Sequence, residues 1–181
     1  MVAIVLGTGF EEVEALTACD ILRRGGVNVK LAGIGGEVIE GAHGIRVVTD
    51  APAEVLEARE LEMIVLPGGL SGVESIMGSP LAMDAVRRTY ESGGIAAAIC
   101  AAPVALAKLG LTDGKNAVCY PGMENQMGSA IMHPDREVVR DGRVITGRAP
   151  AAAIPFALEL LSALRGEETA KRVAEGLVYA G

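Results

Sequence analysis

The sequence contains no tryptophan, and only 3% of its 181 residues are aromatic although 50% are hydrophobic. Aliphatic and small residues must therefore fill the core, which suits helices that pack closely on a sheet. A chain of this length can bury a substantial core in one domain but is too short for two comfortable ones. We therefore expect a single domain that spans residues 1–181.

Cysteine and histidine are also scarce. The three cysteines, Cys19, Cys100 and Cys119, cannot all pair with one another, and their spacing matches no metal-binding motif. With histidine at positions 43 and 133 alone, a zinc site has too few ligands. We therefore predict no metal site, and reduced thiols in a reducing compartment.

Runs of basic residues and long apolar stretches are absent. The net charge of -7 argues against binding to nucleic acid or to an anionic membrane surface. The apolar start of the chain has no basic residue before it and becomes acidic by Glu11, unlike a signal peptide. No apolar stretch approaches the length of a membrane span. We therefore expect a cytoplasmic protein with neither nucleic acid nor membrane as a partner.

Short apolar runs alternate with helix-forming segments along the chain. We predict strands within 2–6, 27–32, 63–66, 94–99 and 117–120, and helices at 11–24, 52–61, 79–92, 104–109, 151–164 and 167–175. Hairpins are expected within 33–50 and at 137–146, where Asp-Gly forms the turn. The alternation predicts an α/β fold, a doubly wound and mostly parallel sheet with helices on both faces. The hairpin at 137–146 would be a small appendage.

Cys100 ends an apolar run of small residues, and a helix-forming segment begins at once after Pro103. A buried strand that turns directly into a helix is typical of a nucleophile elbow. The helix N-terminus favours the thiolate, so we predict a Cys100 pKa below the ordinary value of about 8.5. The alternative is a buried core cysteine.

Glu14 is the candidate partner of Cys100. Sites in doubly wound folds lie beyond the carboxyl ends of the strands, so residues 7–9, residues 67–69 and Cys100 should become neighbours. Glu14, one turn into the first helix, could then reach the sulfur. A charged carboxylate would raise the pKa of the thiol, whereas a protonated one could donate a hydrogen bond to a thiolate. Glu12 nearby is explained by favourable charge at a helix N-terminus.

Glycines near these strand ends allow two further interpretations. The backbone N–H groups of Gly69 and Ala101 could form an anion hole beside the sulfur, with Gly68 lining the pocket, although a plain turn would also contain Pro-Gly-Gly. The pattern Gly7-x-Gly9 resembles a dinucleotide fingerprint but lacks the third glycine and has acidic residues where a pyrophosphate would bind. We therefore expect no cofactor.

Five motifs together resemble the ThiJ/PfpI superfamily, specifically the branch of the parkinsonism-associated deglycase and its bacterial relatives. The motifs are Gly9–Glu14, Arg23–Gly26, Val65–Gly69, Ala98–Pro103 and Thr146–Pro150. The resemblance implies a flavodoxin-like sandwich, a homodimer and an easily oxidised Cys100 that is hydrogen-bonded by protonated Glu14. It also implies glyoxalase or deglycase activity on methylglyoxal and its adducts, or redox-sensing and chaperone roles.

Three positions depart from the patterns of this superfamily. Ala101 follows the cysteine where the protease-like branch has histidine, which argues against a Cys-His peptidase. Tyr120 precedes Pro121 where the deglycase branch often has a pocket histidine, and a phenol is a poor general base at neutral pH. His43 stands in the pocket in place of an arginine.

Two functional hypotheses follow. In the first, the chain is an enzyme, a lyase or hydrolase of the glyoxalase or deglycase type. Cys100 attacks a small dicarbonyl or glycated substrate, and Glu14 acts as general acid and base without a cofactor. In the second, Cys100 is an oxidation sensor or part of a chaperone-type stress protein, and it stops at sulfinate without significant turnover.

Overall fold

A seven-stranded sheet forms the centre of the computed structural model, which describes residues 1–56 and 61–179. Its strands are β1 (Val2–Leu6), β2 (Val29–Gly33), β5 (Ala51–Pro52), β6 (Met63–Leu66), β7 (Ile95–Ile99), β10 (Val138–Asp141) and β11 (Val144–Gly147). Their order is β10-β11-β7-β6-β1-β2-β5, and every pair is parallel except β10 with β11. Two small sheets stand apart, one of β3 (Val38–Glu40) with β4 (Arg46–Val48), the other of β8 (Asn116–Ala117) with β9 (Ile131–Met132).

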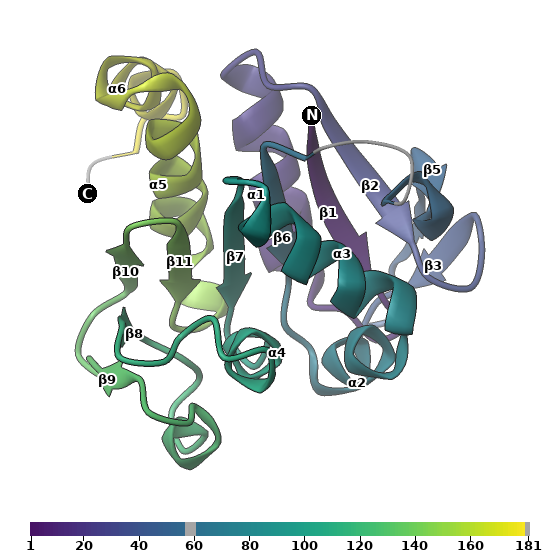
Figure 1. The fold of residues 1–181 in the computed structure, drawn as a ribbon. Coiled ribbons are helices and arrows are strands. Elements are labelled where there is room, and N and C mark those ends of the chain that lie inside the picture. The colour runs from purple at the N-terminus through teal and green to yellow at the C-terminus, as the bar shows by residue number, and fades with distance from the viewer. Residues whose placement is uncertain (57–60, 180–181) are drawn as a thin grey trace.

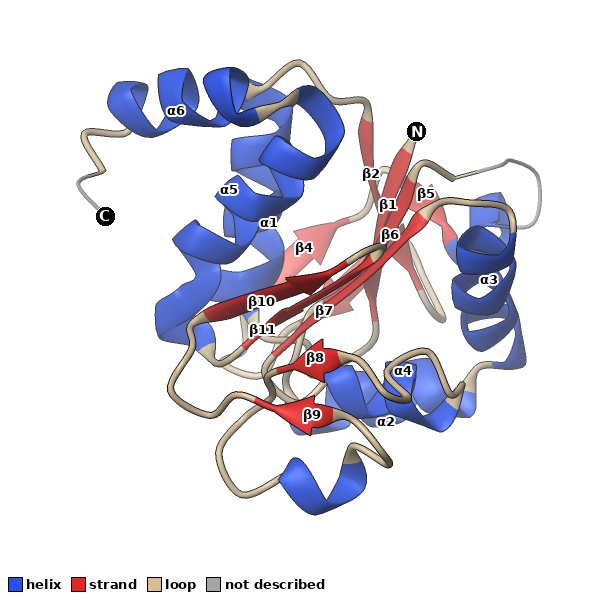
Figure 2. Ribbon diagram, turned by 60° about the vertical axis from the view of Figure 1, so that its left-hand side comes forward, coloured by secondary structure: helices blue, strands red, loops and turns tan. Residues whose placement is uncertain are grey.

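Helices cover both faces of this sheet (Figures 1 and 2). One face carries α1 (Glu12–Arg24) and α5 (Ala153–Arg165), with α6 (Glu167–Gly176) packed on α5, and the other carries α2 (Leu70–Gly78), α3 (Pro80–Glu91) and α4 (Pro103–Lys108). Short 3₁₀ turns lie at Ala53–Leu56, Glu124–Gln126 and Pro150–Ala152. Among the described residues, no helix has the length and apolar character needed to cross a bilayer.

The composition explains this architecture. All five residues of β1 are buried, as expected of a parallel strand covered on both faces. The centre of β7 is the run Ala96–Ala98, whose side chains are fully buried and small enough for helices to approach closely. The predicted α/β fold with a mostly parallel sheet is therefore confirmed, as are most element boundaries to within two or three residues.

Several local predictions need correction. The hairpin at 137–146 is present but is not an appendage, because β11 pairs in parallel with β7 inside the main sheet. The predicted strand at 117–120 is reduced to β8, and α2 was not predicted. The predicted helix at 52–61 appears as a 3₁₀ turn at Ala53–Leu56, and residues 57–60 lie outside the described part of the chain.

Three chain segments meet at one edge of the sheet, as predicted. Because β7, β6 and β1 are parallel neighbours, the residues after their carboxyl ends lie side by side. Glu11 N–H donates to the carbonyl of Gly68 at 2.9 Å, and Gly9 N–H donates to the carbonyl of Glu40 at 2.8 Å. These bonds tie the turn after β1 to the turn after β6 and to the end of β3.

Thr146 provides a test of this packing. Its buried Oγ1 accepts the N–H of Val118 at 2.9 Å, which ties β11 to the segment that leads to Tyr120. Thr146→Val leaves that N–H buried without an acceptor, so we expect a loss of about 1–3 kcal/mol in the free energy of unfolding. Urea titration followed by circular dichroism measures it.

Thr112 is the matched control. It is also fully buried, but its Oγ1 has no hydrogen-bond partner among the described residues. Thr112→Val removes an unsatisfied hydroxyl and should be nearly neutral or stabilising. Equal losses in the two variants would contradict the role assigned to Thr146.

Candidate functional site

Cys100 occupies a strained turn between β7 and α4. Its φ is +64°, in the left-handed region that side chains other than glycine rarely adopt. Backbone bonds hold it on both sides: Cys100 N–H donates to Gly147 at 2.9 Å, and Cys100 C=O accepts from Tyr120 N–H at 2.7 Å. The predicted nucleophile elbow is therefore confirmed as a backbone geometry.

Glu14 and Cys100 meet around Gly68. The Glu14 side chain is buried, with 1% of its surface exposed, and its Oε2 accepts the N–H of Gly68 at 2.6 Å. A Cβ added to Gly68 would lie 2.7 Å from Glu14 Oε2, 2.7 Å from Cys100 Cβ and 3.1 Å from Cys100 Sγ. Only glycine fits between the two side chains, so the structure brings together the pair that the sequence predicted.

The protonation of this pair is set mainly by burial. Burial raises the pKa of Glu14 to about 7, against the lowering effects of the Gly68 N–H and the Cys100 thiol. Burial, followed by the charge of Glu14, raises the pKa of Cys100 to about 12. The predicted Cys100 pKa below about 8.5 is therefore wrong. The helix-terminus argument omitted the cost of placing a thiolate in a dry site beside a carboxylate.

One carboxyl oxygen of Glu14, Oε1, is buried and has no hydrogen-bond partner among the described residues. The Cys100 thiol beside this carboxyl lowers the pKa of Glu14. A proton on Glu14 would remove the negative charge that disfavours a thiolate at Cys100. The two groups therefore titrate as a coupled pair that exchanges one proton.

The backbone N–H groups of Ala101 and Gly69 act on the same sulfur. Both lower the pKa of the Cys100 thiol, although less strongly than burial and Glu14 raise it. Gly69 has φ +84°, and a Cβ there would overlap the carbonyl oxygen of Gly9. An anion hole formed by the N–H groups of Gly69 and Ala101 stays a prediction.

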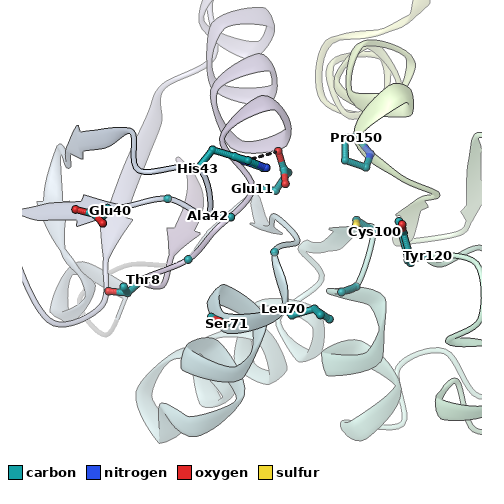
Figure 3. Close-up of a pocket in the computed structure, with 14 residues that line it drawn as sticks. Thr8, Glu11, Glu40, Ala42, His43, Leu70, Ser71, Cys100, Tyr120 and Pro150 are labelled. Atoms are coloured by element: carbon teal, nitrogen blue, oxygen red, sulfur yellow. Dashed lines mark ion pairs between the residues drawn. The ribbon is translucent and has the colours of Figure 1, made fainter.

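A cleft of about 610 Å³ opens above Cys100 (Figure 3). Cys100, Tyr120 and Pro150 lie on one side, and His43 and Glu11 lie on the other. Gly69 and Ala101 also line the cleft, whereas Gly68 and Glu14 lie outside its lining. Tyr120 is 46% exposed.

Glu12 is the residue whose role the sequence did not reveal. Its side chain is 3% exposed, and Oε1 accepts the N–H groups of His43 at 2.8 Å and Ile45 at 3.4 Å. Oε2 lies 2.8 Å from Nδ1 of His43. Burial opposes ionisation, but these hydrogen bonds lower the pKa of Glu12 below its usual value. Glu12 therefore does more than supply charge at the helix N-terminus.

Glu11, Glu12 and His43 form the one group in residues 1–56 and 61–179 whose ligand atoms could surround a metal ion, all within 4.8 Å of one another. The Glu12 oxygens already accept from two backbone N–H groups and contact the ring of His43. We therefore infer that this cluster orients the ring of His43 and does not bind a metal ion.

The remaining thiols and histidine lie apart from the cleft lining. Cys119 is 2% exposed, and its Sγ lies 3.5 Å from the carbonyl oxygen of Tyr120, while burial raises its pKa to about 11. His133 contacts Oδ1 of Asn116 through Nε2 at 2.6 Å. Neither His133 nor Cys19 lines the cleft.

Substitution of Glu14 tests the coupling. The carboxylate charge raises the pKa of Cys100, so Glu14→Gln should lower that pKa relative to the wild type. Ultraviolet titration of the thiolate, with Cys100→Ser as the blank, measures the shift. An unchanged or higher pKa would mean that the carboxylate does not act on the sulfur.

Comparison with known proteins identifies the family of this chain. Residues 1–163 match the model of the DJ-1/PfpI family. Protein dj-1beta of Drosophila melanogaster is 38% identical over 179 residues, which cover 98% of this chain and 96% of that protein. The glutathione-independent glyoxalase DJR-1.2 of Caenorhabditis elegans is 30% identical over 170 residues, covering 94% of this chain and 91% of that protein.

Solved structures agree with these sequence relatives. The structure of oxidised Toxoplasma gondii DJ-1 superposes with a TM-score of 0.95 at 31% identity, covering 99% of this chain and 98% of that one. The resemblance to the ThiJ/PfpI superfamily is thereby confirmed over nearly the whole length. The chain belongs to the DJ-1/PfpI family.

Proposed function

We propose that this protein is a cysteine-dependent glyoxalase or deglycase that needs no cofactor and acts on methylglyoxal or its early adducts. The observation that carries the proposal is the convergence of Cys100 and Glu14 around Gly68, next to a cleft of about 610 Å³, which is large enough for a small dicarbonyl. The family and the glyoxalase relative support a DJ-1-type stress or glyoxalase role. The cysteine mechanism is our own inference.

The reaction begins with transfer of the shared proton. With the proton on Glu14, the Cys100 thiolate attacks the aldehyde carbon, and Glu14 gives its proton to the carbonyl oxygen. The Glu14 carboxylate then removes the proton from the former aldehyde carbon and returns it to the neighbouring carbon, while the hydroxyl proton moves from the first oxygen to the neighbouring one. The N–H groups of Gly69 and Ala101 stabilise the negative oxygen that develops. The product is a lactoyl thioester on Cys100, which water hydrolyses to lactate.

Lactate release from methylglyoxal tests this scheme. Cys100→Ser should abolish release, and Glu14→Gln should lower the rate by about a hundredfold or more because the amide cannot carry the proton. Cys119→Ser is the matched control, since that thiol lies outside the cleft lining and its loss should leave the rate unchanged. Glu14→Gln should thus contain more thiolate and yet turn over more slowly.

Two outcomes would contradict the enzymatic proposal. The first is the absence of enzyme-dependent lactate from the wild type. The second is a rate in Cys100→Ser equal to that of the wild type.

A second candidate function is oxidation sensing. The two N–H groups that act on Cys100 Sγ, together with a proton carried by Oε1 of Glu14, could donate to the oxygens of a sulfinate. Under mild peroxide, the wild type should gain two oxygen atoms by intact mass, and Glu14→Ala should oxidise to a different extent. Identical oxidation of the two proteins would argue against the sensor.

We also infer a homodimer in the cytoplasm. The dimer is implied by the superfamily resemblance and is supported by two exposed apolar side chains, Val13 and Ile45, at 52% and 51%. Ile45 donates its N–H to Glu12, the residue before Val13, so both lie near the start of α1. Sedimentation of the intact chain tests the oligomeric state.

A further inference from the structure

We propose that His43, oriented by the buried carboxylate of Glu12, is the general base that activates the water which hydrolyses the thioester on Cys100. This inference rests on the proposed glyoxalase function and adds a second proton-transfer group to it.

The Glu12–His43 contact fixes the tautomer of the imidazole. A carboxylate only accepts hydrogen bonds, so Nδ1 of His43, 2.8 Å from Glu12 Oε2, carries the proton. In the neutral ring, the lone pair is then on Nε2. The side chain of His43 is 67% exposed, so water reaches this nitrogen. A carboxylate that orients a histidine in this way is the usual support of a general base.

The position of Glu12 is determined by more than the imidazole. Its Oε1 accepts the backbone N–H groups of His43 and Ile45, which fixes the loop that carries the histidine. A Cβ added to Gly41 would overlap the Glu12 carboxylate, so the loop packs directly on it. The histidine is therefore held by its backbone and its ring together.

His43 shares the cleft with the reacting sulfur. Figure 3 shows His43 and Glu11 facing the side of the cleft that carries Cys100 and Tyr120. A cleft of about 610 Å³ has room for a three-carbon acyl group together with water, and general-base catalysis through such a water molecule is what the proposal requires.

Other groups near the cleft are less suited to this step. Glu14 lies outside the lining and is occupied with the proton of the sulfur. Glu40 pairs with Arg46 at 2.9 Å, and the phenol of Tyr120 is a poor base at neutral pH. Glu11 lies 3.7 Å from Nδ1 of His43 and adds negative charge beside the ring. The Glu12 hydrogen bond, followed by the charge of Glu11, raises the pKa of His43.

The step is a balanced hydrolysis. The water oxygen bonds to the thioester carbon, and one water proton moves to Nε2 of His43. The carbon–sulfur bond then breaks, and its electron pair leaves on Cys100 as a thiolate. The proton on His43 returns through water to the Cys100–Glu14 pair. The products are lactic acid, which releases its own proton to solvent, and the regenerated thiol.

The test follows the acyl-enzyme by rapid quench and intact mass spectrometry with methylglyoxal. In His43→Ala, we expect kcat to fall by about tenfold or more. An adduct with the mass of one methylglyoxal should then accumulate on Cys100. Hydroxylamine should release it as lactohydroxamate, the product expected of a lactoyl thioester, whereas a hemithioacetal would give only the oxime of methylglyoxal. Added imidazole should restore turnover. His133→Ala, the matched control, removes the other histidine and should behave as the wild type.

Glu12→Gln tests whether Glu12 orients the ring of His43 or only packs against the loop that carries it. The amide oxygen can still accept the two loop N–H groups, but the amide NH₂ donates to Nδ1 and favours the other tautomer. We expect a lower kcat. We also expect the acidic limb of its pH profile to move to lower pH, because Glu12 no longer raises the pKa of His43. Glu11, Glu40 and the Cys100–Glu14 pair, the other titratable groups of this region, are unchanged in this variant.

The outcomes distinguish the two proposals. Wild-type lactate release with an unchanged rate in His43→Ala overturns the role of His43 and leaves the glyoxalase function standing. A slower His43→Ala that accumulates no thioester and gains nothing from imidazole also overturns it, in favour of a structural loop. The absence of wild-type lactate overturns the glyoxalase function and this inference together.

Discussion

Two ionisable groups share one buried space at the edge of the sheet, where Glu14 is 1% exposed and Cys100 is 8% exposed. Water solvates neither group well, so two negative charges there would repel each other strongly. One proton shared by the pair relieves that repulsion, and in the proposed mechanism its transfer converts the thiol into a nucleophile. In that mechanism, the reactivity of Cys100 depends on where this proton lies and does not follow from a low intrinsic thiol pKa.

The backbone around Glu14 and Cys100 must leave room for both side chains in this small buried space. Gly68 leaves room for both side chains, and Gly69 adopts a φ of +84° that allows its N–H to face the sulfur. Cys100 itself adopts a φ of +64°, at a cost of order 1–3 kcal/mol, and bonds to Gly147 and Tyr120 hold it there. The parallel order of β1, β6 and β7 makes these contacts possible, because it brings three strand ends to one place.

Local patterns predicted the parts of the molecule that depend on local physics. Apolar runs such as Val2–Leu6 identified buried strands, and the small residues before Cys100 identified the elbow. The partnership of Glu12 with His43 has no local signal, because 31 residues separate them and Glu12 looks like ordinary helix-terminal charge. Likewise, Leu70–Gly78 follows Pro-Gly-Gly and contains an internal glycine, so packing on its neighbours decides its helical state. The prediction of a low pKa for Cys100 failed for the same reason, because burial, which raises this pKa, depends on the tertiary structure.

The first turn of α1 combines these local and tertiary effects in one element. Glu12 and Glu14 are two residues apart, so a rotation of about 100° per residue directs them to nearly opposite sides of the helix. Both are buried, yet their pKa values move in opposite directions. Glu12 receives two backbone N–H groups and an imidazole, which keep it ionised, whereas Glu14 receives one N–H group and faces a thiol. One turn of helix thus carries two buried carboxyls in different environments. We propose that one is an anion that orients a base and the other a carboxyl that exchanges a proton, and their partners determine which is which.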